Sequence, residues 1–140
     1  MKIKMISLIV LLAVNSALFA QHNFSVEVSG VDPGKGSVFF GLYDKEKGFL
    51  DNESQIATAK VKATENKVVY TFKNLPDGDY AIAVYQDLNN NGKCDKNMIG
   101  YPTEGFGFSK NYKPKFSAPS FDQVKIAINQ YAKTNIVLIK

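Results

Sequence analysis

Cysteine, histidine and tryptophan are almost missing from this sequence, which removes much of the usual catalytic and covalent chemistry. Its 140 residues include one cysteine, one histidine and no tryptophan. Because Cys94 is the only cysteine, no disulfide can form within the chain, and stability must come from a hydrophobic core. Because His22 is the only histidine, a zinc site with three histidine ligands is excluded, and a Ser–His–Asp or Cys–His centre would depend on this one residue. We therefore expect a protein that is not an enzyme.

The first twenty residues have the pattern of an export signal. Lys2 and Lys4 give a charged start, residues 6–19 are almost wholly apolar, and Ala20 is a small residue suited to the position before a cut. A membrane anchor is the alternative, but the apolar run is shorter than the roughly 20 residues that a spanning helix needs. We predict a signal peptide over residues 1–20 and a single mature domain over residues 21–140, with no membrane span after cleavage. The protein would then be periplasmic, on the outer surface or extracellular.

Export gives the lone cysteine two interpretations. An unpaired cysteine in an exported protein can be a reactive thiol or can link two chains. Cys94 can also be a small apolar residue packed under its own loop, because free cysteines are among the most buried residue types. We favour the second interpretation.

No strong charge imbalance remains after the signal peptide is removed. The whole chain has 17 basic residues against 13 acidic ones, and without Lys2 and Lys4 the balance is 15 against 13. The lysines are spread along the chain with acidic residues between them, whereas nucleic-acid binding usually leaves a concentrated basic segment. We expect no nucleic acid as a partner, which leaves an extracytoplasmic protein or a glycan.

Alternation of apolar and polar residues predicts β-strands along nearly the whole domain. In the second segment, for example, Val38, Phe40 and Leu42 share one face. No apolar repeat of useful length has helical spacing. Seven segments qualify at near-regular spacing, namely residues 24–28, 36–43, 56–63, 68–72, 80–85, 121–131 and 135–140. This pattern predicts an all-β fold, an antiparallel seven-stranded β-sandwich.

Three connections between these strands are informative. Residues 64–67 are expected to close a hairpin between the strands on either side. The segment Leu75-Pro76-Asp77-Gly78 has the residue order of a type I turn, and we expect Gly78 at positive φ at the entry to a central strand. Residues 88–120 form one long connection, which implies that it is functional or is held by its own side chains.

Two stretches resemble known families. The segment FKNLPDGDYAIAVYQD, residues 72–87, is similar to the strand entry of transthyretin-like (prealbumin-like) sandwiches, which include B-type repeats and the carboxypeptidase regulatory domain. The run D-x-N-x-N-G-x-x-D with IGYPTEGFGFS and APSF resembles a family of small secreted bacterial proteins of unknown function. This second resemblance spans most of residues 24–140. It implies a transthyretin-like sandwich and export, and it implies no activity.

The loop after residue 86 has the oxygen spacing of a Ca²⁺ site. Side-chain oxygens and a glycine recur as in an EF-hand-like loop, and one backbone carbonyl would complete the pattern. The match ends where Met98 stands in place of a bidentate Glu, although Glu104 could reach back. The alternative is an Asx-rich turn without metal. We expect weak Ca²⁺ binding, with Kd on the order of 10⁻⁴–10⁻³ M, through Asp87, Asn89, Asn91, the Lys93 carbonyl, Asp95 and Glu104.

The segment Gly105-Phe106-Gly107-Phe108, with Tyr101 and Tyr112 nearby, is a second candidate site. Glycines let a ligand approach the backbone and the ring faces closely, so these four aromatic residues could bind a sugar or a peptide. The alternative is that the two phenylalanines close the end of the sandwich beneath the long connection. We favour this second role for them.

These observations predict an exported, non-catalytic binding or structural module that Ca²⁺ could stabilise. One alternative is a carboxylate-dependent hydrolase that uses Asp77 with Asp79 or Asp87 with Asp95, and a deep acidic pocket beside residues 87–104 would support it. Another is a carrier of a small molecule or a glycan that uses the GFGF segment.

Overall fold

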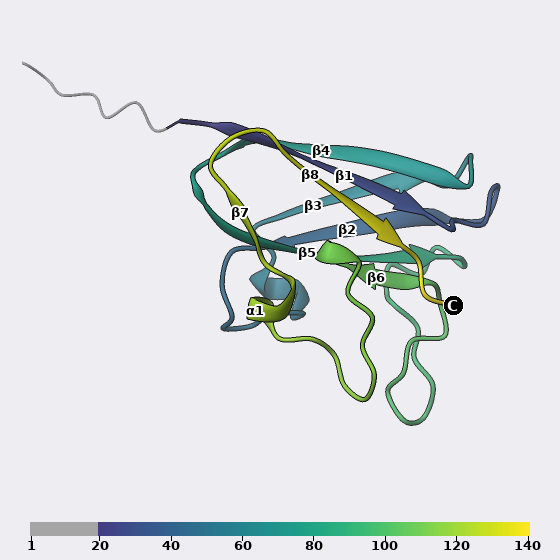
Figure 1. Ribbon diagram of the computed structural model, residues 1–140. Coiled ribbons are helices and arrows are strands. Elements are labelled where there is room, and N and C mark those ends of the chain that lie inside the picture. Colours follow the sequence, from purple (N-terminus) through teal and green to yellow (C-terminus); the bar gives the residue numbers. More distant parts are fainter. Residues whose placement is uncertain (1–19) are drawn as a thin grey trace, which may run out of the picture.

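The computed structural model describes residues 20–140, which form an all-β domain of two sheets (Figure 1). The predicted signal peptide, apart from Ala20, lies outside the described residues. Among residues 20–140, no helix is long and apolar enough to cross a lipid bilayer. The strands are β1 (His22–Ser29), β2 (Ser37–Tyr43), β3 (Ala57–Lys62), β4 (Lys67–Leu75), β5 (Gly78–Asp87), β6 (Phe106–Phe108), β7 (Ile126–Ile128) and β8 (Ala132–Val137). The helical elements are α1 (Phe121–Val124) and two 3-10 turns, η1 (Asn52–Ser54) and η2 (Ser109–Asn111).

The strands are divided between a three-stranded and a five-stranded sheet. The first has the order β4-β1-β8, and the second has the order β3-β2-β5-β6 with β7 paired to β5 as well. The long strand β5 is the centre of the second sheet, because β2 pairs along most of its length while β6 and β7 pair with different parts of it. The chain leaves β5 at Asp87 and enters the loop with the predicted Ca²⁺ pattern.

The inner faces of the two sheets meet in one hydrophobic core. Alternate residues of β1, β2 and β5 point into it, as the sequence pattern predicts for half-buried strands. These side chains have no exposed surface: Phe24, Val26, Val28, Val38, Phe40, Leu42 and Ile82. Among the residues that the structure describes, the strands and all of this core lie within residues 22–138.

The prediction of an antiparallel, seven-stranded arrangement is wrong in two respects. Strand β8 runs parallel to β1, with Phe24 paired to Ala132 and Ser29 to Val137. An eighth strand, β6, lies within the predicted long connection of residues 88–120 and pairs with β5. Alternation shows which face of a strand is buried, but it carries no information about the direction of the neighbouring strand or about strands of three residues.

The segment over residues 121–131, predicted to be one strand, begins with the helical turn α1. Ser120 caps it in a capping box, in which the Ser120 N–H donates to Oε1 of Gln123 (2.9 Å). This Ser-x-x-Gln signature was present in the sequence, and the alternation of Val124, Ile126 and Ile128 concealed it.

Two of the predicted connections cross between the sheets. Residues 64–67 do not close a hairpin, because β3 belongs to the five-stranded sheet and β4 to the three-stranded one. The segment from Leu75 to Gly78 carries the chain back from β4 to β5. The expected positive φ at Gly78 is wrong: the left-handed residue is Asn74, with φ of 59°. A Cβ at Gly78 would meet only the Tyr80 ring, at 3.4 Å.

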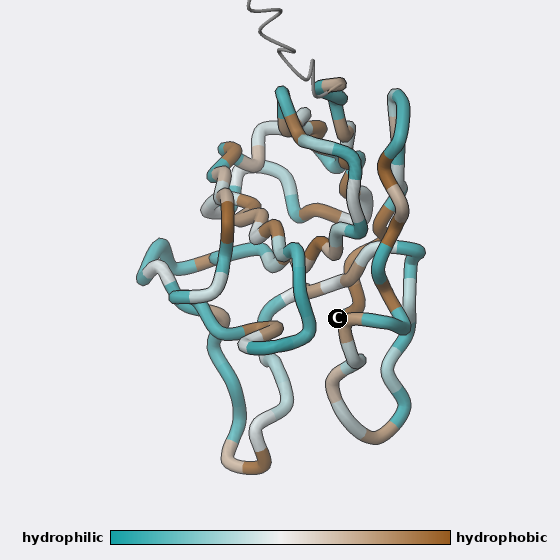
Figure 2. Tube along the Cα trace, turned by 90° about the vertical axis from the view of Figure 1, so that its left-hand side faces the viewer, coloured by the Kyte–Doolittle hydropathy of each residue, from teal (hydrophilic) through white to brown (hydrophobic). Residues whose placement is uncertain are grey.

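Loops and a second apolar cluster cover the outer face of the five-stranded sheet. The cluster contains Tyr43, Ala81, Phe106, Phe108, Phe121 and Val124. Two long loops, residues 88–105 and 112–120, project from the same side of the domain in Figure 1. Figure 2 shows that these loops are mainly hydrophilic but have hydrophobic residues at their tips. The candidate site lies among them.

Candidate functional site

A cleft of about 770 Å³ lies on the outer face of the five-stranded sheet. Side chains of β2, β5 and β6 form its floor, and residues from the loops 50–55, 93–102 and 114–118 form its walls. Three of the four predicted aromatic binding residues line it, namely Tyr101, Phe106 and Phe108. The fourth, Tyr112, packs against the second apolar cluster instead.

The floor of the cleft combines stacked rings with an ordered amide. Phe39 and Tyr85 stack with their centroids 5.3 Å apart and their planes at 28°. Beside them, Nε2 of Gln55 donates to the Tyr43 hydroxyl (3.0 Å). Gly41 lies between Phe39 and Tyr43 on the same face of β2, and a Cβ there would come within 2.6 Å of the Gln55 amide. The glycine therefore makes room for a polar group on an otherwise aromatic floor.

The loop that follows β5 folds around the carboxylate of Asp87. This side chain is almost wholly buried, and its Oδ1 and Oδ2 accept the N–H groups of Asn91 (3.0 Å) and Gly92 (2.8 Å). Asn89 Oδ1 also accepts the Asn91 N–H (3.1 Å), and Asn91 Oδ1 accepts the Lys93 N–H (2.9 Å). The two bonds to the Asp87 carboxylate are charge-assisted, and together these contacts satisfy N–H groups that a tight turn leaves without backbone partners.

Glu104 closes the base of the same loop. Its side chain is buried, Oε1 accepts the Leu88 N–H (2.8 Å), and Oε2 accepts the Asp95 N–H (3.1 Å). Glu104 does reach back to the loop, but it meets two backbone N–H groups. One carboxylate thus joins the start of the loop to its middle.

The predicted Ca²⁺ ligands are brought together in a way that fits a cation weakly. Nδ2 of Asn89 and Nδ2 of Asn91 donate to the two oxygens of Asp95, at 2.7 and 2.8 Å, so these side chains converge beside Asp87. Among residues 20–140, no three His, Cys, Asp or Glu side chains form a metal-binding group. A cation would therefore also need the amide oxygens and the Lys93 carbonyl. Turning the amide oxygens inward would cost the two hydrogen bonds to Asp95.

The GFGF segment is a strand rather than a flexible loop. Phe106 and Phe108 are buried in the second apolar cluster, where their ring centroids lie 6.0 Å apart. A Cβ at Gly107 would come within 2.4 Å of Cγ2 of Ile136 in β8, so the glycine is needed for packing between β6 and β8. Both phenylalanines also border the cleft, where Tyr101 meets Phe106 edge to face at 5.5 Å.

Two ionisable side chains on the cleft lining are held in their neutral forms. Burial raises the pKa of the Cys94 thiol to about 11, and the negative charge of Glu104 adds to this shift. Burial also raises the pKa of the Tyr85 hydroxyl to about 12, with a further contribution from Asp87. The thiolate is the reactive form of cysteine, so at neutral pH Cys94 is an unreactive, half-buried side chain.

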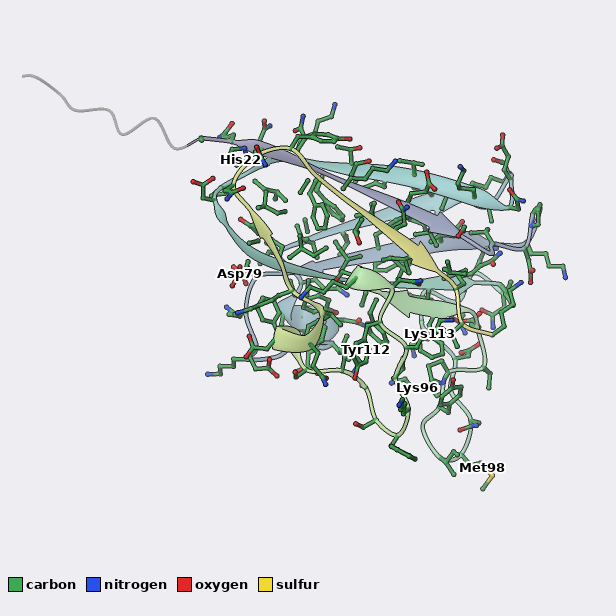
Figure 3. All side chains as sticks on the ribbon, viewed as in Figure 1. His22, Asp79, Lys96, Met98, Tyr112 and Lys113 are labelled. Carbon is green, nitrogen blue, oxygen red and sulfur yellow. The ribbon has the colours of Figure 1, made fainter. Side chains whose placement is uncertain are left out.

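The other carboxylate pair considered for catalysis is not a pair in the structure. Asp77 accepts from the His22 ring (2.5 Å), and Asp79 contacts the Lys125 ammonium (3.0 Å). Figure 3 shows His22 and Asp79 well away from the loop that carries Met98. The only histidine is therefore part of β1 and remote from the cleft.

Sequence reasoning missed several residues that shape the site. Gln86 occupies a core-facing position of β5, where its amide bonds to the backbone of Asp32 and Lys35 (2.7–2.9 Å) and fixes the turn before β2. A polar residue in register with Ile82 and Val84 was a signal that could have identified it. The contributions of Gln55 and Phe116 had no such signal, because they depend on how distant loops fold over the sheet.

The comparisons with known proteins give one family. Residues 26–136 match the family described as "Uncharacterized protein conserved in bacteria (DUF2141)". No curated protein and no solved structure gives a match. The matched range includes the Asp/Asn loop, the GFGF strand and every wall of the cleft. The chain belongs to this bacterial family, DUF2141.

Proposed function

We propose that the domain is an exported, non-catalytic binding module whose ligand enters the cleft on the outer face of the five-stranded sheet. The observation that supports this function is the cleft itself, at about 770 Å³ with an aromatic floor and three loops as walls. Small-molecule sites typically measure ~300–1,000 Å³ and combine apolar walls with a few polar groups. Loops held on a rigid sheet are also where binding residues tend to gather.

The lining favours a small molecule or a glycan with an acidic group. The rings of Tyr85 and Tyr101 offer stacking surfaces, as aromatic side chains do for sugars and other flat ligands. Hydrogen-bonding groups come from Asn52 and Gln55. Positive charge comes from three lysines on the lining: Lys93, Lys96 and Lys115.

Binding is favoured over carboxylate-dependent hydrolysis by the same lining. General acid–base chemistry with carboxyl groups needs two of them at the substrate. Among the described residues that line the cleft, Asp51 is the single acidic one, against three lysines. Asp87 and Glu104 direct their oxygens at backbone N–H groups instead.

A weak Ca²⁺ site in the Asp/Asn loop would stiffen one wall of the cleft. Lys93 and Cys94 belong to this loop and also line the cleft, so a cation held by Asp87 and Asp95 would fix their positions.

The fold and the cell location are part of the same proposal. The two-sheet architecture and the LPDG entry to β5 support a transthyretin-like sandwich, and the first twenty residues support export.

The cleft is tested by titrating isotope-labelled protein with neutral and acidic oligosaccharides and following the amide resonances by NMR. We expect acidic sugars to shift residues around Tyr85 and Tyr101. Tyr101→Ala should weaken binding, because this half-exposed ring borders the cleft. Tyr131→Ala is the matched control, since it removes an exposed tyrosine elsewhere. Shifts that survive Tyr101→Ala, or that gather away from the cleft, would contradict the proposed site.

Binding of Ca²⁺ to the loop is tested by calorimetry and by thermal melts that compare Ca²⁺ with a chelator. A ligand at ten times its Kd stabilises the folded state by about 1.4 kcal/mol, so millimolar Ca²⁺ should raise Tm by a few degrees. Asp87→Ala combined with Asp95→Ala should abolish the heat and the shift, whereas Asp44→Ala, at an exposed position, should keep both. A shift that persists in the double variant would show that the loop is a plain turn.

A further inference from the structure

Two loop tips expose large apolar side chains on the same side of the molecule. Met98 and Phe116 are fully exposed, and Ile99 is 87% exposed. Both loops project in the same direction in Figures 1 and 2, and Figure 3 shows Met98 at the far end of its loop, pointing away from the sheets. Ile99 and Phe116 both border the cleft, so the two tips flank its mouth.

The first tip is a hydrogen-bonded turn that presents its apolar residues outward. The Gly100 N–H donates to the Asn97 carbonyl (2.9 Å), and Asn97 Oδ1 accepts the N–H groups of Ile99 (3.1 Å) and Tyr101 (3.0 Å). Gly100 takes the left-handed φ of 81° that ends the turn. Met98 and Ile99 therefore occupy its two central positions, where polar or small residues are usual. Large apolar side chains held in water at such a position indicate a surface that is covered in use.

Lysines accompany the two tips. The two loops, residues 88–105 and 112–120, contain four lysines and two acidic residues, one of which is the buried Glu104, whereas the rest of residues 21–140 contains eleven lysines and eleven acidic residues. The excess positive charge of the domain is therefore concentrated in these loops. All four are exposed, and none forms an ion pair within residues 20–140: Lys93, Lys96, Lys113 and Lys115.

We propose that the two tips, residues 97–100 and 115–117, insert into the headgroup region of an anionic lipid bilayer. The apolar side chains would leave water at the boundary with the acyl chains, and the lysines would meet the negatively charged headgroups. Lysine suits this position because its long apolar stem can follow the inserted tip while the ammonium stays at the interface. The mouth of the cleft then faces the membrane. This inference goes beyond the proposed function, because docking requires no ligand in the cleft.

The arrangement fits a bilayer better than a protein partner. A protein would need two separate apolar pockets spaced to receive both tips, with acidic groups around them. A fluid bilayer accepts separate apolar tips without shape complementarity and surrounds both with negative charge. The tips lie on one side of the domain, as insertion into a plane requires.

The proposal is tested by co-sedimentation of residues 21–140 with lipid vesicles. Vesicles of phosphatidylcholine are compared with vesicles that also contain roughly 30% phosphatidylglycerol, at low and high salt. We expect binding to the anionic vesicles that weakens with salt. Combining Met98→Ser, Ile99→Ser and Phe116→Ser should reduce binding by about tenfold or more, because three apolar side chains no longer leave water. Val69→Ser is the matched control, since it replaces an exposed apolar residue of β4.

The contribution of the lysines and the depth of tip insertion are measured in separate experiments. Lys96→Glu with Lys115→Glu should abolish the preference for anionic vesicles, whereas Lys73→Glu, at an exposed position of β4, should not. The chain has no tryptophan, so Phe116→Trp introduces a single reporter. Its emission should shift to shorter wavelength on anionic vesicles and be quenched by lipids with brominated acyl chains. Val69→Trp should show neither effect.

The outcomes distinguish this proposal from the proposed function. The tip variants change exposed side chains, so they should keep the Tm of the parent protein and any Ca²⁺ binding. Met98→Ser alone changes a tip residue outside the cleft lining, so it should weaken vesicle binding and keep any oligosaccharide binding. Equal vesicle binding by the triple variant would overturn the proposal. So would residues 21–140 remaining in the supernatant with every vesicle, in which case the tips serve a protein partner. Equal binding to neutral and anionic vesicles would refute the role of the lysines.

Discussion

On the inner face of the five-stranded sheet, Phe40 is completely buried against the three-stranded sheet, while on the outer face its neighbour Phe39 stacks on Tyr85 at the floor of a cleft. Successive residues of one strand thus enter two different environments. The inner face is covered by a second sheet and is mainly apolar, with Gln86 as a core-facing polar residue of β5. The outer face is covered by loops, and its apolar cluster is smaller and interrupted by polar groups.

The two faces of the sheet are stabilised in different ways. Between the sheets, burial of apolar surface is sufficient, because the strands satisfy their own backbone groups. Loops have no such ladder, so their N–H groups need side-chain acceptors, which Asp87 and Glu104 supply. The inner face is therefore held by apolar burial, and the outer face is held by apolar burial together with carboxylates that satisfy the N–H groups of the loop.

The largest expected effect comes from exchanging neighbours on the two faces. Phe40→Ala should lower the free energy of unfolding by about 3–5 kcal/mol, because it leaves a cavity between two packed sheets. Phe39→Ala removes the same atoms from the half-buried outer side and should cost less than half as much. Urea denaturation of both variants measures the difference. Equal losses would show that the loops pack the outer face as tightly as a second sheet.

A second comparison concerns two glycines of the five-stranded sheet. Gly107→Ala should cost roughly 1–3 kcal/mol, because the new Cβ would come too close to Ile136 and force β6 away from β8. Gly78→Ala should stay within about 0.5 kcal/mol, because its φ is not left-handed and its Cβ would meet only the Tyr80 ring. Denaturation midpoints decide between them. A greater loss at Gly78 would restore the turn constraint expected from the sequence.

The inner face could be predicted from the sequence, and most of the outer face could not. Alternation identified the buried residues of β1, β2 and β5, because a side-chain period of two follows from strand geometry alone. Strand direction was not encoded in this way, so the parallel pairing of β8 with β1 was missed. The crossing between sheets at residues 64–67 was missed for the same reason, since a short connection does not show which sheet receives the next strand.

In the candidate site, too, contacts between residues near in sequence could be predicted, and contacts between distant residues could not. The Asp/Asn spacing after β5 correctly indicated a loop organised by its own side chains, because Asx turns are local in sequence. The partners of Glu104 were not predictable, since they lie nine and sixteen residues away and depend on how the loop folds back. The cleft needed three loops to meet over one sheet. No local pattern contains that information.

A third and smaller loss of stability is expected when the carboxylate of Glu104, which holds the loop after β5, is replaced. Glu104→Gln keeps the shape but replaces one acceptor oxygen with an amide N–H, which then faces a backbone N–H. We expect a loss of about 1–2 kcal/mol in urea denaturation, from the unsatisfied donor and the lost charge-assisted bond. Glu53→Gln, at an exposed position of η1, should change stability by less than about 0.5 kcal/mol. An unchanged urea midpoint for Glu104→Gln would mean that the loop after β5 folds without the contacts of this carboxylate.

The smallest expected effect on stability comes from the thiol of Cys94 in the cleft. Its state is measured by the rate at which a disulfide reagent modifies the thiol. Burial and the charge of Glu104 raise the pKa of Cys94 to about 11, so its thiolate is scarce at pH 8. In chelator, a disulfide reagent should modify the folded protein on the order of a hundredfold more slowly than the urea-unfolded protein, whose thiol has an ordinary pKa near 8.5. The rate should rise about tenfold per pH unit up to the folded-state pKa.

The sign of the linked effect on stability follows from proton binding. Above the unfolded-state pKa the folded protein holds the thiol proton more tightly, so the free energy of unfolding falls as pH rises from about 8.5 towards 11. Glu104→Gln removes a negative charge beside the thiol and should both lower this pKa and speed modification, provided that the urea midpoint shows a folded protein. Fast modification of the parent protein at pH 8 would place Cys94 in open solvent and separate the loop from the cleft.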